Sequence, residues 1–96
     1  MTTPGNESSL WAVVPAYNEE TGIGATLAAL ASQTDTRFTL AVVDNASTDA
    51  TAAVVRRFAA TAPFPVHLVR EEERGTGAAV DTGFRYAVAH GAAQLV

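Results

Sequence analysis

Residues 38–49 read Phe-Thr-Leu-Ala-Val-Val-Asp-Asn-Ala-Ser-Thr-Asp. The first six form an apolar, β-branched run, which is typical of a strand buried on both faces of a sheet. The next six are turn formers and helix-capping residues, so the strand is predicted to end there and a helix to begin at about Asp49. That helix is expected to reach about Ala60 and to bury Val54, Phe58 and either Val55 or Ala59. The stretch therefore predicts one unit of strand, loop and helix.

The same unit is predicted before this stretch. Residues 10–14 form a short apolar run closed by Pro15, which has the length of a buried strand. Residues 21–32 carry apolar side chains at helical spacing, and Asn18 or Thr21 is available as the helix cap. The ordered part of the chain is thus expected to begin with a strand and to continue into a helix.

A third unit is predicted after it. Residues 66–69 form a strand, and a helix follows from Gly75-Thr76-Gly77 to Gly91. The buried face of this helix is expected to hold Val80, Phe84, Ala87 and Val88. Residues 92–96 begin a fourth strand, at whose start we expect the domain to be truncated. Alternating strands and helices predict βαβ units and a three-layer, parallel-sheet α/β fold of Rossmann-like type.

Composition excludes several classes of protein. The chain has 96 residues, of which 48% are hydrophobic and 17% charged, so it is too apolar for a disordered segment and large enough for one domain. It has no cysteine, which excludes a disulfide framework and thiolate metal sites. The formal charge is −4 and the basic residues are scattered, which argues against nucleic-acid binding. Its apolar runs are too short for a membrane segment.

The beginning of the chain differs from the rest in composition. Residues 1–9 are polar and lack the apolar core of a signal peptide, so we expect a disordered leader followed by a domain at residues 10–96. The expected location is the cytoplasm, with the cytoplasmic face of the membrane as an alternative for a longer protein.

Three polar loops follow the three predicted strands, at residues 15–20, 44–49 and 70–77. Because ligands bind beyond the carboxyl ends of parallel strands, these loops are expected to form one site. Tyr17 offers a flat ring for a base or sugar, while Glu19 and Asp44 offer acceptors for ribose hydroxyls or a base imide. Arg74 and the free amides at the helix starts favour a diphosphate. The loops therefore suit a nucleotide.

Simpler structural roles are also open for several polar residues. Glu20 and Asp49 suit the positive end of a helix dipole, Ser47 and Thr48 suit helix caps, and residues 71–73 suit a solvated charge run. Trp11 is predicted to lie in the core, and neither His67 nor His90 is expected to bind metal or act in catalysis. The Gly75-x-Gly77 pair resembles a dinucleotide fingerprint, but Val80 replaces its third glycine.

Three motifs together resemble the N-terminal nucleotide-binding half of family 2 glycosyltransferases, which have the GT-A fold. They are Val-Val-Pro-Ala-Tyr-Asn-Glu-Glu at residues 13–20, Val-Val-Asp-Asn-Ala-Ser-Thr-Asp at 42–49, and Gly-Thr-Gly-Ala-Ala at 75–79 with Gly83. The resemblance covers about residues 10–96. It implies transfer of a sugar, with inversion, from a UDP-, GDP- or dTDP-sugar to an acceptor hydroxyl.

The resemblance also implies which residues bind the donor. Those expected to line its nucleotide or pass its diphosphate are Pro15, Ala16, Tyr17, Glu19, Asp44, Asn45, Arg74 and Gly77. Asn45 stands where many members have a second aspartate. At positions 80–83 the family often has a basic residue and an asparagine before the glycine, whereas this chain has Val-Asp-Thr-Gly.

The family's catalytic groups have no counterpart in these 96 residues. Its DxD motif holds Mg2+ or Mn2+ on the diphosphate, and a later carboxylate deprotonates the acceptor; no Asp-x-Asp occurs here. A divalent cation is thus expected for a longer enzyme, and this chain alone is expected to be inactive. Two alternatives remain: a non-catalytic, Rossmann-type nucleotide- or dinucleotide-binding domain, and an interaction module completed by a partner.

Overall fold

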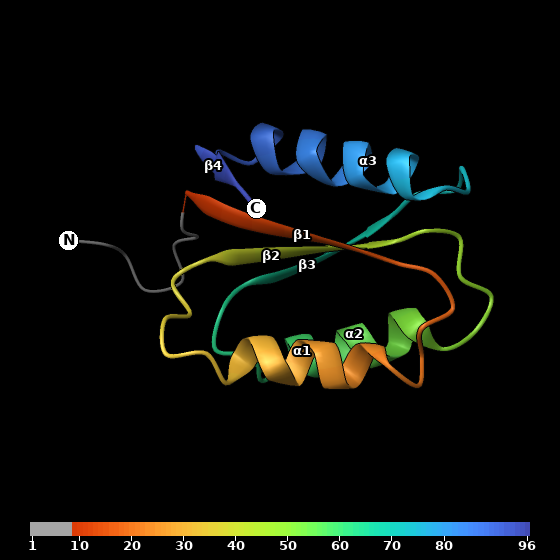
Figure 1. Ribbon diagram of the computed structural model, residues 1–96, viewed down its shortest axis with the longest axis horizontal. Coiled ribbons are helices and arrows are strands. Elements are labelled where there is room, and N and C mark those ends of the chain that lie inside the picture. The colour runs from red at the N-terminus through yellow and green to blue at the C-terminus, as the bar shows by residue number, and fades with distance from the viewer. Residues whose placement is uncertain (1–8) are drawn as a thin grey trace.

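The computed structural model describes residues 9–96, so nearly all of the predicted leader lies outside the described residues. Strands and helices alternate along the described chain (Figure 1). They are β1 (Leu10–Ala16), α1 (Ile23–Ala31), β2 (Thr39–Asp44), α2 (Thr51–Ala59), β3 (Val66–Arg70), α3 (Thr76–Ala89) and β4 (Gln94–Leu95). This order confirms the predicted succession of units.

The strands form one parallel sheet in the order β3-β2-β1-β4. Helices α1 and α2 cover one face of this sheet and α3 covers the other, which confirms the predicted three-layer α/β fold (Figure 1). The chain moves outward from β1 through β2 to β3, and α3 then carries it back so that β4 pairs with the opposite side of β1. The direction of winding thus reverses at β1, and in open parallel sheets such a reversal is where ligands bind.

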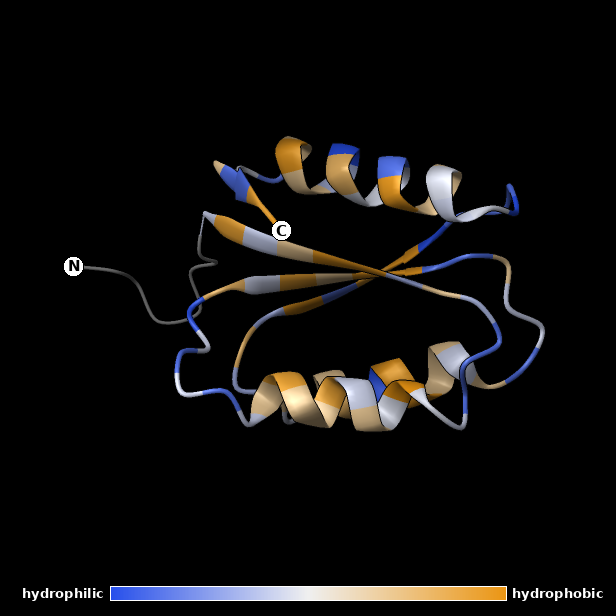
Figure 2. Cartoon of the chain, in the orientation of Figure 1, coloured by the Kyte–Doolittle hydropathy of each residue, from blue (hydrophilic) through white to orange (hydrophobic). Residues whose placement is uncertain are grey.

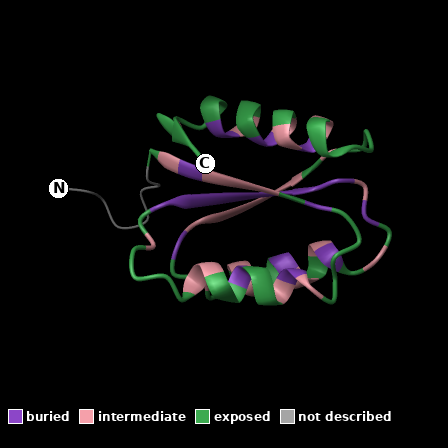
Figure 3. Ribbon diagram, in the orientation of Figure 1, coloured by how far each residue is buried: buried purple, intermediate pink, exposed green. Residues whose placement is uncertain are grey.

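The main core lies between the sheet and α1 and α2. Strand β2 is buried along its whole length, as Figure 3 shows, and its apolar residues stand out in Figure 2. Leu40 and Val42 pack on this side against Leu27 of α1 and Val55 of α2, and all four have no exposed surface. Val55 is therefore the fully buried residue of the predicted α2 face, while Val54 and Phe58 are half-buried.

Helix α3 packs on the sheet through its small residues, so the face predicted for it is largely wrong. Ala79, Gly83 and Ala87 are buried, whereas Phe84 is 37% exposed and Val88 is 61% exposed. A Cβ atom on Gly83 would lie 2.4 Å from Cγ1 of Val13 and 2.9 Å from Cγ2 of Val43. The backbone of α3 therefore lies so close to β1 and β2 that no side chain fits at this position, and larger residues turn outward.

Strand β1 continues through Pro15 to Ala16, so the prediction that Pro15 closes the strand is wrong. The amide of Val13 donates to the carbonyl of Val96, which places Val13 and, two residues on, Pro15 toward the β4 side. The β1–β4 pairs are Leu10 with Gln94 and Trp11 with Leu95, so Pro15 lies beyond them and is not required to donate to that ladder. The strand can therefore extend to the loop that follows it.

Trp11 is fully buried on the α3 side, which confirms its predicted place in the core. Its ring lies 4.9 Å from that of His67 and 6.1 Å from that of Tyr86, measured between centroids. The Tyr86 hydroxyl lies 2.8 Å from Nδ1 of His67, and the Tyr86 ring stacks on His90 at 4.0 Å. Both histidines thus belong to an aromatic cluster near the amino-terminal ends of the strands, away from the loops considered below.

Candidate functional site

A cavity of about 310 Å³ opens between the carboxyl end of β1 and the start of α3, where the winding of the sheet reverses. It is lined by Pro15, Ala16, Tyr17, Glu19, Asn45 and Thr76. Apart from Thr76, all of these residues were expected at the donor site, and the polar loops after β1 and β2 are brought together here. Thr76 lies in the third predicted loop, residues 70–77, and is the first residue of α3. We call this cavity the donor pocket after the role predicted for its residues, and its volume is that of small ligand sites.

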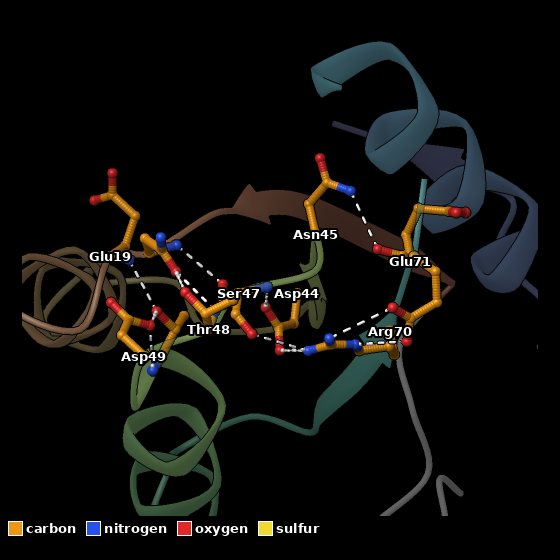
Figure 4. Close-up of polar contacts among 11 residues, drawn as sticks. Glu19, Asp44, Asn45, Ser47, Thr48, Asp49, Arg70 and Glu71 are labelled. Carbon is orange, nitrogen blue, oxygen red and sulfur yellow. Dashed lines mark hydrogen bonds and ion pairs between the residues drawn. The ribbon is translucent and has the colours of Figure 1, made fainter. Parts of the chain in front are cut away.

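Asp44 and Asn45 are adjacent in sequence but point to different partners (Figure 4). Asp44 is 2% exposed and is not among the residues that line the donor pocket. Its Oδ2 lies 2.9 Å from Nη1 of Arg70, and its Oδ1 accepts a hydrogen bond from the amide of Ser47 at 3.1 Å. Arg70 is a partner that the sequence analysis missed. The sequence signal for this ion pair is an acidic residue and a basic residue at the ends of neighbouring strands, because the parallel register pairs Asp44 with Arg70.

The loops after β1 and β2 are joined by side-chain contacts to main-chain groups. The amide of Asn18 donates to Oγ of Ser47 at 2.9 Å, and the amide of Thr48 donates to Oδ1 of Asn18 at 2.9 Å. The amide of Glu19 donates to Oγ1 of Thr51 at 2.8 Å. These contacts correct the predicted capping roles, because the side chains of Asn18 and Ser47 bind the opposite loop instead of a helix end.

The helix starts themselves lie elsewhere than predicted. Gly22 precedes α1 and Ala50 precedes α2; neither of these residues caps its helix with a side chain, and no acidic residue lies in either first turn. Asp49 lies just before α2, where Oδ1 accepts hydrogen bonds from the amide of Thr51 at 2.9 Å and from its hydroxyl at 2.5 Å. Its Oδ2 accepts one from the amide of Glu20 at 3.3 Å, and Glu20 accepts one from Ala50. Asp49 thus links both loops.

These contacts predict a loss of stability in acid. The hydroxyl of Thr51 lowers the pKa of Asp49 below its ordinary value, followed by smaller contributions from main-chain amides. A carboxylate whose pKa is lowered on folding stabilises the fold at neutral pH, and this contribution disappears as pH falls through the lowered pKa. Urea unfolding from pH 7 to pH 3 should therefore show a smaller loss of stability for Asp49→Asn than for the wild type. Glu73→Gln, which removes an exposed carboxylate, serves as the control. Equal acid sensitivity of Asp49→Asn and the wild type would contradict a stabilising role of ionised Asp49.

Arg74 lies against Tyr17 at the rim of the donor pocket. Its guanidinium carbon is 3.7 Å from the centroid of the Tyr17 ring, a cation–π distance. Two residues on, α3 begins at Thr76, and the start of a helix presents free amides to an anion. A Cβ atom on Gly77 would meet nothing within 4 Å, so the helix start is open at this point. The structure thus brings the predicted Arg74 to the side of Tyr17, whereas Gly77 is not among the residues that line the pocket.

The loop between β3 and α3 is held more firmly than a solvated charge run would be. Glu71 is half-buried and accepts hydrogen bonds from the hydroxyl of Thr82 and the amide of Glu73. The Thr82 hydroxyl, ahead of the main-chain amides, lowers the pKa of Glu71. Nε of Arg70 lies 2.8 Å from Oε2 of the exposed Glu72. The prediction of a solvated run therefore holds for Glu72 and Glu73 but is wrong for Glu71.

Within residues 9–96, no three His, Asp or Glu side chains lie close enough together to form a metal site. These residues therefore do not fit a divalent cation on their own. Within the same range, none of the helices has the length and apolar character needed to cross a bilayer.

The chain matches one protein-family model and is similar to several known proteins. The family model described as Glycosyl transferase family 2 matches residues 11–90. Glycosyltransferase AglE of Haloferax volcanii is 36% identical over 73 residues, which are 74% of this chain and 24% of AglE. An uncharacterized protein of Methanocaldococcus jannaschii is 36% identical over 78 residues, or 80% of this chain and 33% of that protein.

A solved structure is similar as well. It is the mannosyltransferase PcManGT from Pyrobaculum calidifontis in complex with GDP-Man and Mn2+, with a TM-score of 0.65 and 33% sequence identity. The match covers 86% of this chain and 25% of the mannosyltransferase. The chain thus spans between about a quarter and a third of the proteins it matches. Since the family match runs from β1 to the end of α3 and includes every loop at the donor pocket, the chain belongs to family 2 of the glycosyltransferases.

Proposed function

We propose that this chain forms the donor-nucleotide-binding portion of an inverting glycosyltransferase, which takes a sugar from a nucleotide-diphosphate sugar. The observation that carries the proposal is the donor pocket at the carboxyl end of β1, because residues from separate loops meet there at the reversal point of the sheet. The similar mannosyltransferase holds GDP-Man, so GDP is the first nucleotide to test, followed by UDP and dTDP.

Each part of a nucleotide diphosphate has a suitable neighbour at this site. Tyr17 offers an aromatic surface to a base or sugar, and Glu19 offers a carboxylate to ribose hydroxyls. Arg74 and the open start of α3 offer positive charge and free amides to the diphosphate. Asp44 and Gly77 are proposed donor contacts on the resemblance, while the observed contacts of Asp44 are with Arg70 and Ser47.

A divalent cation would need ligands from outside residues 9–96. Because residues 9–96 hold no cluster that fits a divalent cation, we attribute no step of binding by this chain to Mg2+ or Mn2+. We propose that in a longer enzyme such a cation would be held by groups outside these residues. Calorimetric titration with GDP, UDP, dTDP and the corresponding nucleotide sugars should therefore give saturable binding in metal-free buffer.

The Tyr17→Ala variant should bind the preferred nucleotide at least about fivefold more weakly, because stacking of a base on an aromatic ring contributes about 1–3 kcal/mol. Phe84→Ala is the matched control, since Phe84 is 37% exposed and Tyr17 is 38% exposed, but Phe84 lies on the outer face of α3. Its affinity should equal that of the wild type. Absence of saturable binding to every nucleotide would refute the proposal, and preferential binding of NADH would favour the dinucleotide-binding alternative.

A further inference from the structure

The side chain of Asn45 is buried and makes three hydrogen bonds to the loop between β3 and α3. The residue is 4% exposed. Its amide nitrogen donates to the carbonyl of Glu71 at 3.1 Å and to the carbonyl of Glu73 at 2.6 Å. Its Oδ1 accepts a hydrogen bond from the amide of Gly75 at 2.9 Å. Figure 4 shows the side chain lying beside Glu71. One side chain on the β2 loop thus binds three points of a segment about 30 residues away.

The chemistry of these contacts requires an amide. An asparagine side chain has two N–H donors and a carbonyl acceptor, which match the two carbonyls and the one N–H that it meets. A carboxylate of the same shape would turn an oxygen toward two carbonyl oxygens, and a buried acceptor without a donor is costly. Asn45 therefore has a role here that an aspartate would not fill.

Two of the contacts lie on either side of Arg74. Glu73 and Gly75 are its immediate neighbours, and Asn45 binds the carbonyl of the first and the amide of the second. Gly75 has φ of +133°, a conformation that side-chain-bearing residues rarely adopt, so the turn after Arg74 is sharply defined. Arg74 is itself exposed, and its guanidinium lies over the Tyr17 ring. The position of its main chain is thus set by Asn45.

We propose that Asn45 is a positioning residue, which holds the main chain on both sides of Arg74 and thereby places that guanidinium at the donor pocket. The expected effect of Asn45 on nucleotide affinity rests on the proposed function. Its effect on the loop around Arg74 does not. In this role Asn45 acts through Arg74 in place of direct contact with a base.

The structural part is tested by NMR on the whole chain without nucleotide. In the wild type the Gly75 amide should exchange slowly, and the Arg74 side-chain resonances should be shifted upfield by the Tyr17 ring. In Asn45→Ala and Asn45→Asp, Gly75 exchange should accelerate at least about tenfold and the Arg74 shifts should move toward unstructured values. Gln33→Glu, an exposed amide-to-carboxylate change, should alter neither. A wild type without the Arg74 shift would overturn the proposal whether or not the variants fold. A folded Asn45 variant that retains the shift would overturn it as well, and Asn45→Asp provides a second variant if Asn45→Ala does not fold.

The functional part is tested by a double-mutant cycle on GDP affinity. If Asn45 acts through Arg74, Asn45→Ala and Arg74→Ala should each weaken binding by about tenfold, and the double variant should bind no more weakly than Arg74→Ala alone. Losses that multiply in the double variant would overturn the proposal, because Asn45 would then act by another route. Should the wild type bind no nucleotide at all, the proposed function fails, and the Gly75 and Arg74 measurements still decide whether Asn45 positions the loop.

Discussion

Gly83→Ala is expected to destabilise the chain by about 1–3 kcal/mol, the usual cost of forcing an extra carbon into a packed core. The new Cβ would lie 2.4 Å from Cγ1 of Val13 and 2.9 Å from Cγ2 of Val43, and both valines are short, branched side chains on the central strands. Neither can swing away as a long side chain would, so α3 would have to move off the sheet. The effect should appear in urea unfolding monitored by circular dichroism.

A second helical glycine provides the control. Gly24 lies inside α1, where a Cβ atom would come no closer than 3.9 Å to Cγ1 of Val54. Gly24→Ala should therefore be neutral or stabilising by up to about 1 kcal/mol, since alanine is the better helix former. A Gly83→Ala protein as stable as Gly24→Ala would contradict the close approach of α3 to β1 and β2.

Arg70→Met is expected to lower the thermal midpoint at pH 7 by roughly 5 °C. The side chain of Asp44 is 3% exposed, and removal of its cation would leave a buried carboxylate without a countercharge. Since the Arg70 side chain is 47% exposed, water can replace part of what is lost, which keeps the effect below that of a fully buried pair. Asp44→Asn should be milder, because it removes the buried charge and leaves Arg70 with Glu72.

The comparison between these two variants is the decisive measurement. Thermal unfolding should rank Arg70→Met below Asp44→Asn, and Glu72→Gln should resemble the wild type because that pair is exposed. If Asp44→Asn proved the less stable of the two, the Asp44 carboxylate would stabilise the fold more through the amide of Ser47 than through Arg70.

The sequence predicted which residues line the cavity at the end of β1 better than it predicted the contacts between them. Pro15, Ala16, Tyr17, Glu19 and Asn45 all line the cavity, because loops after parallel strands open at the same edge of the sheet. Asp44, the last residue of β2, does not line it, because its carboxylate binds Arg70 and the amide of Ser47. Asp44 and Asn45 are both polar, so the sequence alone did not show that they would bind different partners.

The packing of α3 shows the same limit. Apolar periodicity favoured a face with Val80, Phe84 and Val88, since large apolar side chains are usually buried. In the structure the small residues Ala79, Gly83 and Ala87 face the sheet. A helix with a small face can approach a sheet closely, and periodicity of hydropathy does not measure that distance.

Local sequence patterns determine one part of this structure, and contacts between residues far apart in the chain determine the other. The order of its strands and helices, the parallel three-layer fold and the gathering of three polar loops at one edge follow from local patterns, because strand and helix periods and turn residues are written in short stretches of sequence. The pairing of Asp44 with Arg70, the hold of Asn45 on Gly75 and the stacking of Arg74 on Tyr17 join residues 26, 30 and 57 positions apart. Only strand register, side-chain direction and the closeness of α3 to the sheet decide these contacts, since each depends on distances that no short stretch of the chain contains.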